Sequence, residues 1–234
     1  MSEAQILETG LAQLGLALAP SAIRRLLDYL GLLARWNRVY NLTAIRSPAG
    51  MVTHHLLDSL AILPLIEDLS LVEGDCPAAG LRMADVGSGA GLPGIPVAIA
   101  CPALQVTLIE SSHKKAAFLV HAKAELALAN VVVERQRVET WAPPKPFDVV
   151  TSRAFAGLPE FLRLAGHLAR PGGWILAMKG AFPTEELRHL PGDYTVERVV
   201  ALSVPALDAA RHAVVLRKGG QSMEESVSMP VGRR

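Results

Sequence analysis

Four glycines within eight residues form the part of this chain whose spacing points most directly to chemistry. They are Gly87, Gly89, Gly91 and Gly94, and they follow the apolar segment Leu81–Val86. Glycine lets a backbone approach a ligand closely and lets a strand turn sharply into a helix. The next apolar run ends at Glu110, about 20 positions further on, where a carboxylate can bind ribose hydroxyls. The pattern predicts a site for a nucleotide-like cofactor; a ligand-free strand–helix turn is the alternative.

The glycine spacing differs from the two common phosphate-binding loops. A dinucleotide site needs a third small residue that lets the helix pack against the strand, and Leu92 occupies that place. A phosphate loop of the Walker type needs a lysine after its last glycine, and none follows Gly94. Pro93 and Pro96 suit the first turn of a helix. The spacing therefore disfavours both a nicotinamide cofactor and a nucleoside triphosphate.

The elements that must position this loop alternate in type from Leu81 onward. The expected strands are Leu81–Val86, Gln105–Glu110, Val131–Glu134, Phe147–Thr151 and Trp174–Met178. Helical patterns lie between them, at Pro93–Ala100, His113–Ala129 and Leu158–Ala169. This alternation predicts an α/β fold with a parallel, Rossmann-like sheet covered by helices. Two further runs, Thr195–Leu202 and His212–Arg217, are expected to close one sheet edge as a hairpin.

The chain divides into three predicted parts. Residues 1–80 form an N-terminal helical extension, with helices expected over Ile23–Trp36 and Val52–Ile66 from their apolar periodicity. Asp75–Gly80 is expected to be a linker. Residues 81–218 are the sheet domain, and residues 219–234 are polar and aperiodic, which is typical of a flexible tail.

Composition excludes several classes of protein. Half of the residues are hydrophobic, which is enough for a core, and the two cysteines are too few for a disulfide framework. No apolar run is expected to span a membrane and no signal sequence is recognised, so a cytoplasmic protein is expected. The net charge is +1, but residues 82–180 hold 11 Lys/Arg against 7 Asp/Glu. That excess is a weak hint of an anionic substrate beside the cofactor.

Further motifs connect the chain with a known family. The run Asp85-x-Gly87-x-Gly89-x-Gly91 resembles the first motif of class I S-adenosylmethionine-dependent methyltransferases. Seven segments in order resemble the RsmG (GidB) family of bacterial 16S rRNA guanine-N7 methyltransferases, over roughly residues 20–217. They are Trp36–Thr43, His55–Ser59, Gly87–Pro96, Lys114–Leu119, Arg137–Glu139, Thr151–Phe155 and Met178–Gly180.

The resemblance implies both an activity and a set of site residues. The activity is transfer of a methyl group from S-adenosylmethionine to N7 of one guanine in the decoding-region loop of 16S rRNA, as free rRNA or in the small ribosomal subunit. The family's cofactor-contacting positions match Gly87, Leu92, Val138, Glu139 and Arg153, the last near the reacting end. The general fold adds two cofactor contacts, Gly89 and Glu110. The protein is expected to be a monomer without a metal ion and without a membrane partner.

The chemistry of N7 methylation fits the residue types that are present. Guanine N7 carries a lone pair and no proton, so positioning and electrostatics suffice without a general base. Arg153 follows the fourth strand, where it can donate to guanine O6 or to a phosphate. We expect the basic residues Lys114, Arg137, Arg153 and Lys179, with Arg211 as a further RNA contact, to form a rim that grips rRNA; solvated surface charges are the alternative. Other open readings are a methyltransferase for another RNA, a protein or a small molecule, and a non-enzymatic nucleotide-binding module.

Overall fold

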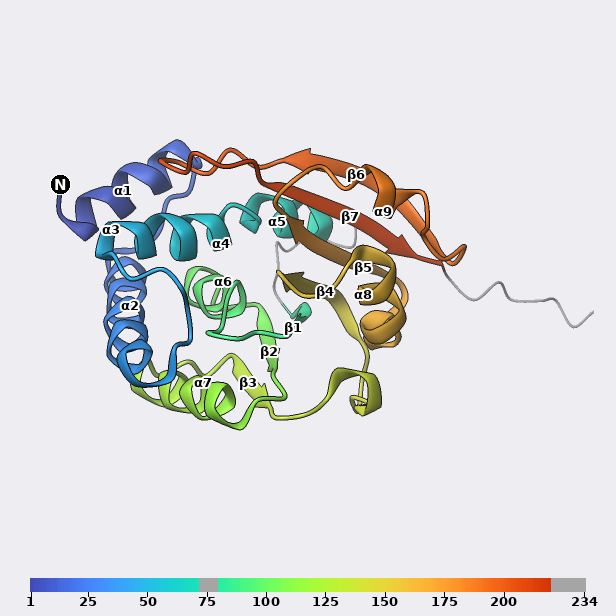
Figure 1. Cartoon of the computed structure of the whole chain (residues 1–234), viewed down its shortest axis with the longest axis horizontal. Helices are drawn as coiled ribbons and strands as arrows, with labels where there is room; N and C mark the ends of the chain where they lie inside the picture. The colour runs from blue at the N-terminus through green and yellow to red at the C-terminus, as the bar shows by residue number, and fades with distance from the viewer. Residues whose placement is uncertain (72–79, 220–234) are drawn as a thin grey trace, which may run out of the picture.

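A seven-stranded sheet forms the centre of the computed structural model, which describes residues 1–71 and 80–219 (Figure 1). Its strands are β1 (Arg82–Val86), β2 (Gln105–Ile109), β3 (Val131–Glu134), β4 (Phe147–Arg153), β5 (Ala169–Lys179), β6 (Tyr194–Ala201) and β7 (His212–Lys218). The strand order is β3-β2-β1-β4-β5-β7-β6. Strands β1 to β5 are parallel, while β7 is antiparallel to both β5 and β6. The predicted α/β class and the closing hairpin at one edge are both confirmed.

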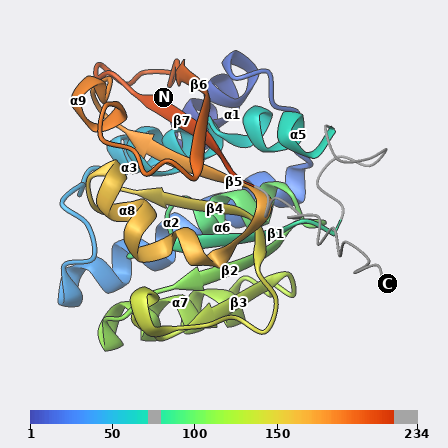
Figure 2. The ribbon, with the colours of Figure 1, turned by 90° about the vertical axis from the view of Figure 1, so that its right-hand side faces the viewer.

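The sheet is covered on both faces because its strands are apolar on both faces. Alternate residues of β1 enter different cores, Met83 on one face and Ala84 and Val86 on the other, as the two-residue period of a strand requires. Helices α6 (Gly94–Ala100) and α7 (His113–Glu125) pack on the Met83 side, and α8 (Leu158–Ala165) packs on the opposite side. Figure 2 shows the strands stacked from β3 at the bottom to β6 at the top, with α8 in front.

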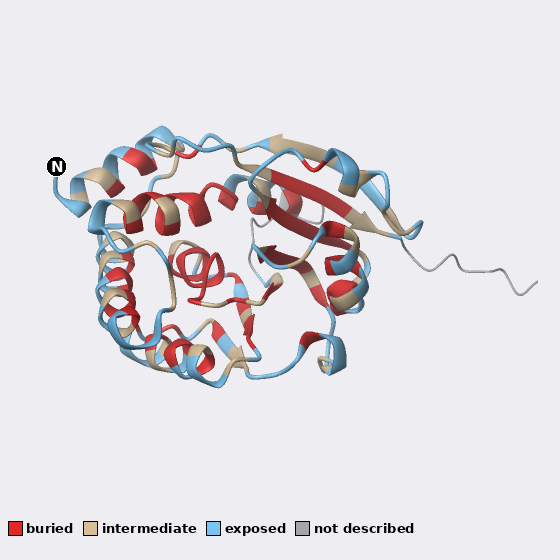
Figure 3. Ribbon diagram, viewed as in Figure 1, coloured by how far each residue is buried: buried red, intermediate tan, exposed pale blue. Residues whose placement is uncertain are grey.

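The N-terminal residues form helices that pack against the sheet domain. They are α1 (Glu3–Gln13), α2 (Pro20–Tyr40), α3 (Pro48–Met51), the π-helical turn η1 (Val52–Leu57), α4 (Asp58–Leu60) and α5 (Leu63–Leu71). Helices α2 and α4 contact α6, and their buried side chains join one continuous core with those of the sheet. Figure 3 shows buried residues on their inner sides and exposed residues outside.

The helix predicted over Val52–Ile66 is interrupted in the structure. Its first part is a π-helical turn, and the helical pattern breaks at residues 61–62 before α5 begins. Pro64 explains the break, because proline lacks the N–H needed for the helix ladder and its ring clashes with the carbonyl four residues earlier. By length and composition the stretch Pro48–Leu69 could cross a membrane, contrary to the expectation from its sequence, but 72% of its apolar 18-residue window is buried inside the protein. That burial is typical of a core helix.

The remaining differences concern boundaries. Strand β5 begins at Ala169, five residues earlier than expected, because the 3-10 turn η3 (Gly166–Leu168) ends the α8 region and Ala169 pairs with Phe147. Helix α7 ends at Glu125, and Ala127 then adopts a left-handed φ of 50°. The predicted linker, except for Gly80, and the tail from residue 220 lie outside the described residues.

Candidate active site

The glycine loop between β1 and α6 is braced by the predicted carboxylate. Gly87, Gly89 and Gly91 have positive φ angles of 66°, 59° and 87°. Residues with a side chain rarely adopt such angles, whereas glycine does so readily. The Gly89 N–H donates to Glu110 Oε2 at 2.9 Å, and the Ser112 N–H donates to Glu110 Oε1 at 2.8 Å. Glu110 is therefore fixed at the end of β2, beside the loop, with lone pairs left for further donors.

Gly94 is the small residue that allows the helix to pack on the strand. A dinucleotide-binding loop would need its small residue at position 92, whereas here a Cβ at Gly94 would clash with the side chains of Leu108 and Asp85. The Gly94 N–H donates to Asp85 Oδ2 at 3.0 Å, so the close approach also gives one oxygen of a buried carboxyl a donor; Oδ1 has no partner within the described residues. Burial raises the pKa of Asp85 to about 7. Leu92 itself is buried in the core.

The third element beside the loop is the short 3-10 turn η2 (Val138–Thr140), which follows β3. Val138 is buried and packs with residues of β1 and β4, whereas Glu139 is exposed. Arg137 approaches Glu139 at 3.8 Å, but its side chain is 76% exposed. A surface pair of this kind contributes little to stability.

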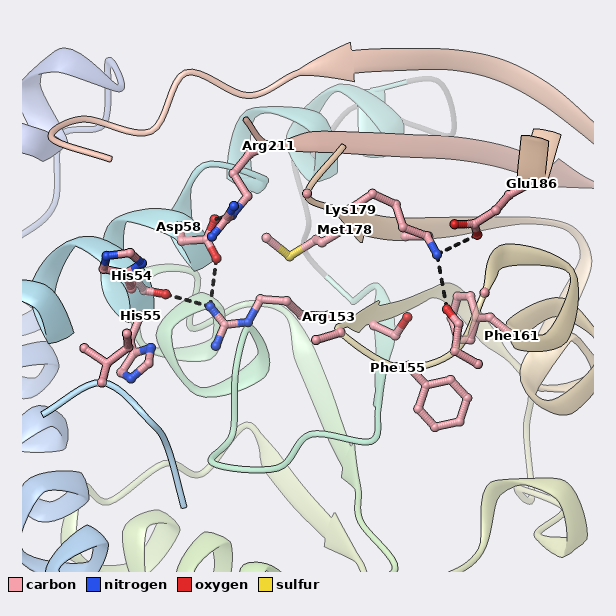
Figure 4. A pocket seen from close by; sticks show the side chains of 17 residues that line it. His54, His55, Asp58, Arg153, Phe155, Phe161, Met178, Lys179, Glu186 and Arg211 are labelled. Atoms are coloured by element: carbon pink, nitrogen blue, oxygen red, sulfur yellow. Dashed lines mark hydrogen bonds and ion pairs between the residues drawn. The ribbon is translucent and has the colours of Figure 1, made fainter. Parts of the chain in front are cut away.

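A cavity of about 640 Å³ opens where β4 and β5 end (Figure 4). This is the edge where an open parallel sheet binds its ligands. Most of the lining comes from the η1–α4 segment, the end of β4 with the loop that follows it, and the end of β5, and single residues come from other elements. The residues are Ile45, His54, His55, Asp58, Ser152, Arg153, Ala154, Phe155, Ala156, Gly157, Phe161, Ala177, Met178, Lys179, Gly180, Glu186 and Arg211.

Two arginines meet at one buried carboxylate in this cavity. Arg153 Nη1 donates to Asp58 Oδ2 at 2.8 Å and to the backbone oxygen of His54 at 2.8 Å. Arg211 Nε donates to Asp58 Oδ1 at 2.9 Å. Both arginines lie beside Asp58 in Figure 4. The η1 turn that carries His54 is π-helical, a geometry frequent at functional sites.

The imidazole of His55 is buried at the side of the cavity. Its Nε2 shares a hydrogen bond of 2.9 Å with Thr43 Oγ1, and its Nδ1 has no partner within the described residues. Burial, and secondly the positive charge of Arg153, lower the pKa of His55 to about 4. His55 is therefore neutral at pH 7.

A second ion pair holds the loop that follows β4. Lys179 Nζ donates to Glu186 Oε2 at 2.7 Å and to the backbone oxygen of Ala156 at 3.1 Å. Glu186 lies on α9 (Thr184–Leu187) and also accepts the Leu158 N–H. Burial opposes the charge of Glu186, but hydrogen bonds from Lys179 and Leu158 outweigh it and lower its pKa. The pair ties β5, α9 and the start of α8 together.

The structure brings only part of the predicted basic rim to one place. Arg153, Lys179 and Arg211 all line the cavity, and each is engaged with a carboxylate. Lys114 at the start of α7 and Arg137 before η2 are exposed and do not line it. The cofactor-site glycines and Glu110 lie together in a separate group, joined through the Gly89–Glu110 hydrogen bond.

Among the cavity residues that were not predicted as site residues are three polar groups of the cavity wall, Asp58, His55 and Glu186. Asp58 carried a signal, since a charged residue inside an apolar helical run is rarely buried without a partner. Glu186 carried none, because its neighbours in sequence are polar and its partners lie 7 and 28 residues away. In residues 1–71 and 80–219, no group of three or more His, Cys, Asp or Glu side chains is placed to hold a metal ion. Cys101 is a free thiol.

Solved structures that resemble this one are methyltransferases. The predicted O-methyltransferase Atu636 from Agrobacterium tumefaciens superposes with a TM-score of 0.52 at 25% identity, over 71% of this chain and 80% of that chain. The N-methyltransferase NodS from Bradyrhizobium japonicum gives a TM-score of 0.50 at 14% identity, over 69% and 97%. The class I methyltransferase fold predicted from the glycine loop is thereby confirmed.

Curated relatives are far more similar in sequence. Ribosomal RNA small subunit methyltransferase G from Nitrosospira multiformis is 49% identical over 228 residues, which cover 94% of this chain and 100% of that protein. The protein of the same name from Ralstonia nicotianae is 52% identical over 210 residues, 90% of this chain and 93% of the relative. Residues 22–215 match the family described as rRNA small subunit methyltransferase G (GidB). The chain belongs to this family of rRNA methyltransferases.

Proposed function

We propose that this protein transfers a methyl group from S-adenosylmethionine to N7 of a guanine in the decoding-region loop of 16S rRNA. The observation that carries the proposal is the pairing of a braced glycine loop with an arginine-lined cavity in a member of this family. The substrate is 16S rRNA, free or in the small ribosomal subunit. We further propose that the protein acts in the cytoplasm as a monomer, without a metal ion.

The glycine loop and its surroundings fit such a cofactor. Gly87 and Gly89 have positive φ angles and no side chains, so bare backbone lies beside the Glu110 carboxyl group. That group is already fixed by two backbone N–H donors, so it is ready to accept ribose hydroxyls. Residues proposed to hold the cofactor are Gly87, Gly89, Leu92, Glu110, Val138, Glu139 and Arg153. Bound there, S-adenosylmethionine would supply an activated methyl group for the N7 lone pair.

The protein's own contribution is orientation. Guanine N7 has no proton to lose, so the site needs no general base. Arg153 is fixed through Nη1 by Asp58 and by the His54 carbonyl, and its remaining N–H groups can donate to guanine O6 or to a phosphate. Fixed donors of this kind lower the barrier by holding the reacting atoms in line. Phe155 and Phe161 supply apolar wall beside them.

Ligand binding and methyl transfer test the proposal separately. Calorimetric titration should give measurable affinity for S-adenosylhomocysteine and none for NAD. Incubation with radiolabelled S-adenosylmethionine and small subunits that lack the modification should label 16S rRNA. A preference for NAD, or labelling of protein instead of RNA, would reject the proposed function.

A further inference from the structure

The carboxylate of Asp58 joins three segments that are far apart in the chain. Asp58 begins α4, Arg153 ends β4 and Arg211 precedes β7. Each oxygen of the carboxylate takes one guanidinium, Oδ2 from Arg153 and Oδ1 from Arg211, at 2.8 and 2.9 Å. The Asp58 side chain is only 2% exposed, while the two arginine side chains are 20% and 24% exposed. The carboxylate is thus at the back of the cavity and the guanidiniums lie in front.

Both arginines keep hydrogen-bond donors for a ligand. Arg153 uses Nη1 for both of its bonds. Arg211 uses Nε for Asp58 and Nη1 for the backbone oxygen of Ala210. Within the described residues, Arg153 Nε and Nη2 and Arg211 Nη2 make no hydrogen bond. Since both side chains line the cavity, these donors are available there.

The charges of the cluster favour a single anion. Two guanidiniums and one carboxylate leave a net charge of +1 in a partly buried site. The carboxylate between the two positive groups offsets their mutual repulsion and holds them side by side. Replacing buried ion clusters by apolar residues is often neutral or stabilising, so stability alone is a poor reason for this arrangement. Guanidinium forks match the geometry of a phosphate better than any other basic side chain.

We propose that Asp58 is a positioning residue that holds Arg153 and Arg211 together as a receptor for one phosphodiester of the RNA strand beside the target guanine. The inference rests on the proposed function. It assigns the arginine pair to RNA, because Arg211 and Asp58 are not among the residues proposed to hold the cofactor. Arg153, which is also proposed to contact the cofactor, then lies between the cofactor and the RNA strand. Asp58 itself touches neither reactant.

The variant Asp58→Asn tests this role, since it keeps the shape of the side chain but places an amide N–H₂ against one arginine. We expect KM for small subunits to rise at least tenfold and the slope of log affinity against log salt to fall by about one unit. Affinity for S-adenosylhomocysteine should fall by less than threefold, because the glycine loop and Glu110 supply the other proposed cofactor contacts. Removing a negative charge would tighten RNA binding if Asp58 acted only through its long-range field, so weaker binding identifies positioning.

Asp148→Asn is the matched control. Asp148 also divides its oxygens between two donors, Arg170 Nε and the Arg82 N–H, both at 2.8 Å, but at the amino end of β4. It should leave KM and the salt slope within twofold of the wild-type values. The same change in both variants would assign the Asp58 effect to general destabilisation and overturn the inference.

A double-mutant cycle with Arg211→Gln completes the test. If Asp58 acts by holding the arginines, the double variant should lose little more affinity for small subunits than either single variant; independent losses would contradict the inference. If Asp58→Asn does not fold, Arg211→Gln alone must lower the salt slope and spare S-adenosylhomocysteine affinity; the reverse pattern would assign the receptor to the cofactor. If the wild-type protein methylates no rRNA, the proposed function is wrong. If the wild type is active and the Asp58 and Arg211 variants bind small subunits as it does, only the phosphodiester receptor is rejected.

Discussion

At the scale of single residues, Gly87 and His55 allow the proposed cofactor loop and the cavity to be tested separately. Gly87 turns the chain out of β1 with a φ of 66°, and a Cβ there would lie 2.7 Å from Phe155 Cδ2. His55 is buried and neutral, and the charge of Arg153 helps to keep it so. Gly87 shapes the proposed cofactor loop, and His55 lines the adjoining cavity.

Gly87→Ala should weaken S-adenosylhomocysteine binding at least tenfold. A left-handed conformation costs an L-residue about 1–2 kcal/mol, and the new methyl group must also displace the Phe155 ring. Calorimetric titration measures the effect. Gly31→Ala on α2 is the control, because a Cβ at Gly31 meets nothing within 4 Å. An affinity of Gly87→Ala within twofold of the wild type would contradict the placement of the cofactor at this loop.

The stability of the protein should depend on His55 between pH 7 and pH 5. The pKa of His55 is about 4 in the folded protein, against 6.5 for an ordinary solvent-exposed histidine such as the unfolded chain presents. As the pH falls through this window, the unfolded chain binds a proton that the folded protein refuses, so stability is lost. The loss attributable to His55 is about 2 kcal/mol between pH 7 and pH 5.

The measurement compares the wild-type protein with His55→Gln by urea unfolding at both pH values. Asp85 acts in the opposite direction over the same range, because burial raises its pKa to about 7. That contribution is common to both proteins and cancels in the difference. The wild type should lose about 2 kcal/mol more than the variant on acidification. Parallel losses would show that His55 is not held neutral.

At the scale of elements, helix α2 supports the glycine loop directly. The Tyr29 hydroxyl, fully buried, donates to the backbone oxygen of Ala90 at 2.7 Å across 61 residues of sequence. Tyr29 also packs on Phe118 of α7, with ring centroids 6.4 Å apart. The N-terminal helices therefore reach both the proposed cofactor loop, through Tyr29, and the cavity, through Asp58.

Tyr29→Phe removes that hydrogen bond and leaves the Ala90 carbonyl buried without its partner. The free energy of unfolding should fall by about 1–2 kcal/mol, the usual cost of an orphaned buried acceptor. Urea unfolding measures it, and S-adenosylhomocysteine affinity should weaken in parallel. Tyr40→Phe on the same helix is the control, since Tyr40 is 40% exposed and should change stability by less than about 0.5 kcal/mol. Equal effects of both variants would exclude a special role for Tyr29.

The strands and the glycine loop were predictable because their signals are local. Short apolar runs, glycines at fixed spacing and Glu110 at the end of a run each mark their own place in the fold. The break at Pro64 was also local, but the strong apolar periodicity around it concealed the interruption. The Asp58 cluster depends on partners 95 and 153 residues away. No pattern in one sequence reports such distances, so Arg211 was predicted to contact RNA without its carboxylate.

At the scale of the whole molecule, two sites meet at one edge of the sheet. The glycine loop follows β1, and the cavity opens beyond β4 and β5, which are the next strands in the sheet order. A cofactor at the first and a base at the second would approach each other at the carboxyl ends of neighbouring strands. The exposed Lys114 and Arg137 remain candidates for more distant rRNA phosphates.

The most direct test is cleavage-based mapping of N7-methylguanine in 16S rRNA from cells with and without the gene. We expect one cleavage in the decoding-region loop that disappears on deletion and returns with the wild-type gene but not with Gly87→Ala. An unchanged cleavage pattern in the deletion strain would show that this protein does not methylate N7 of that guanine.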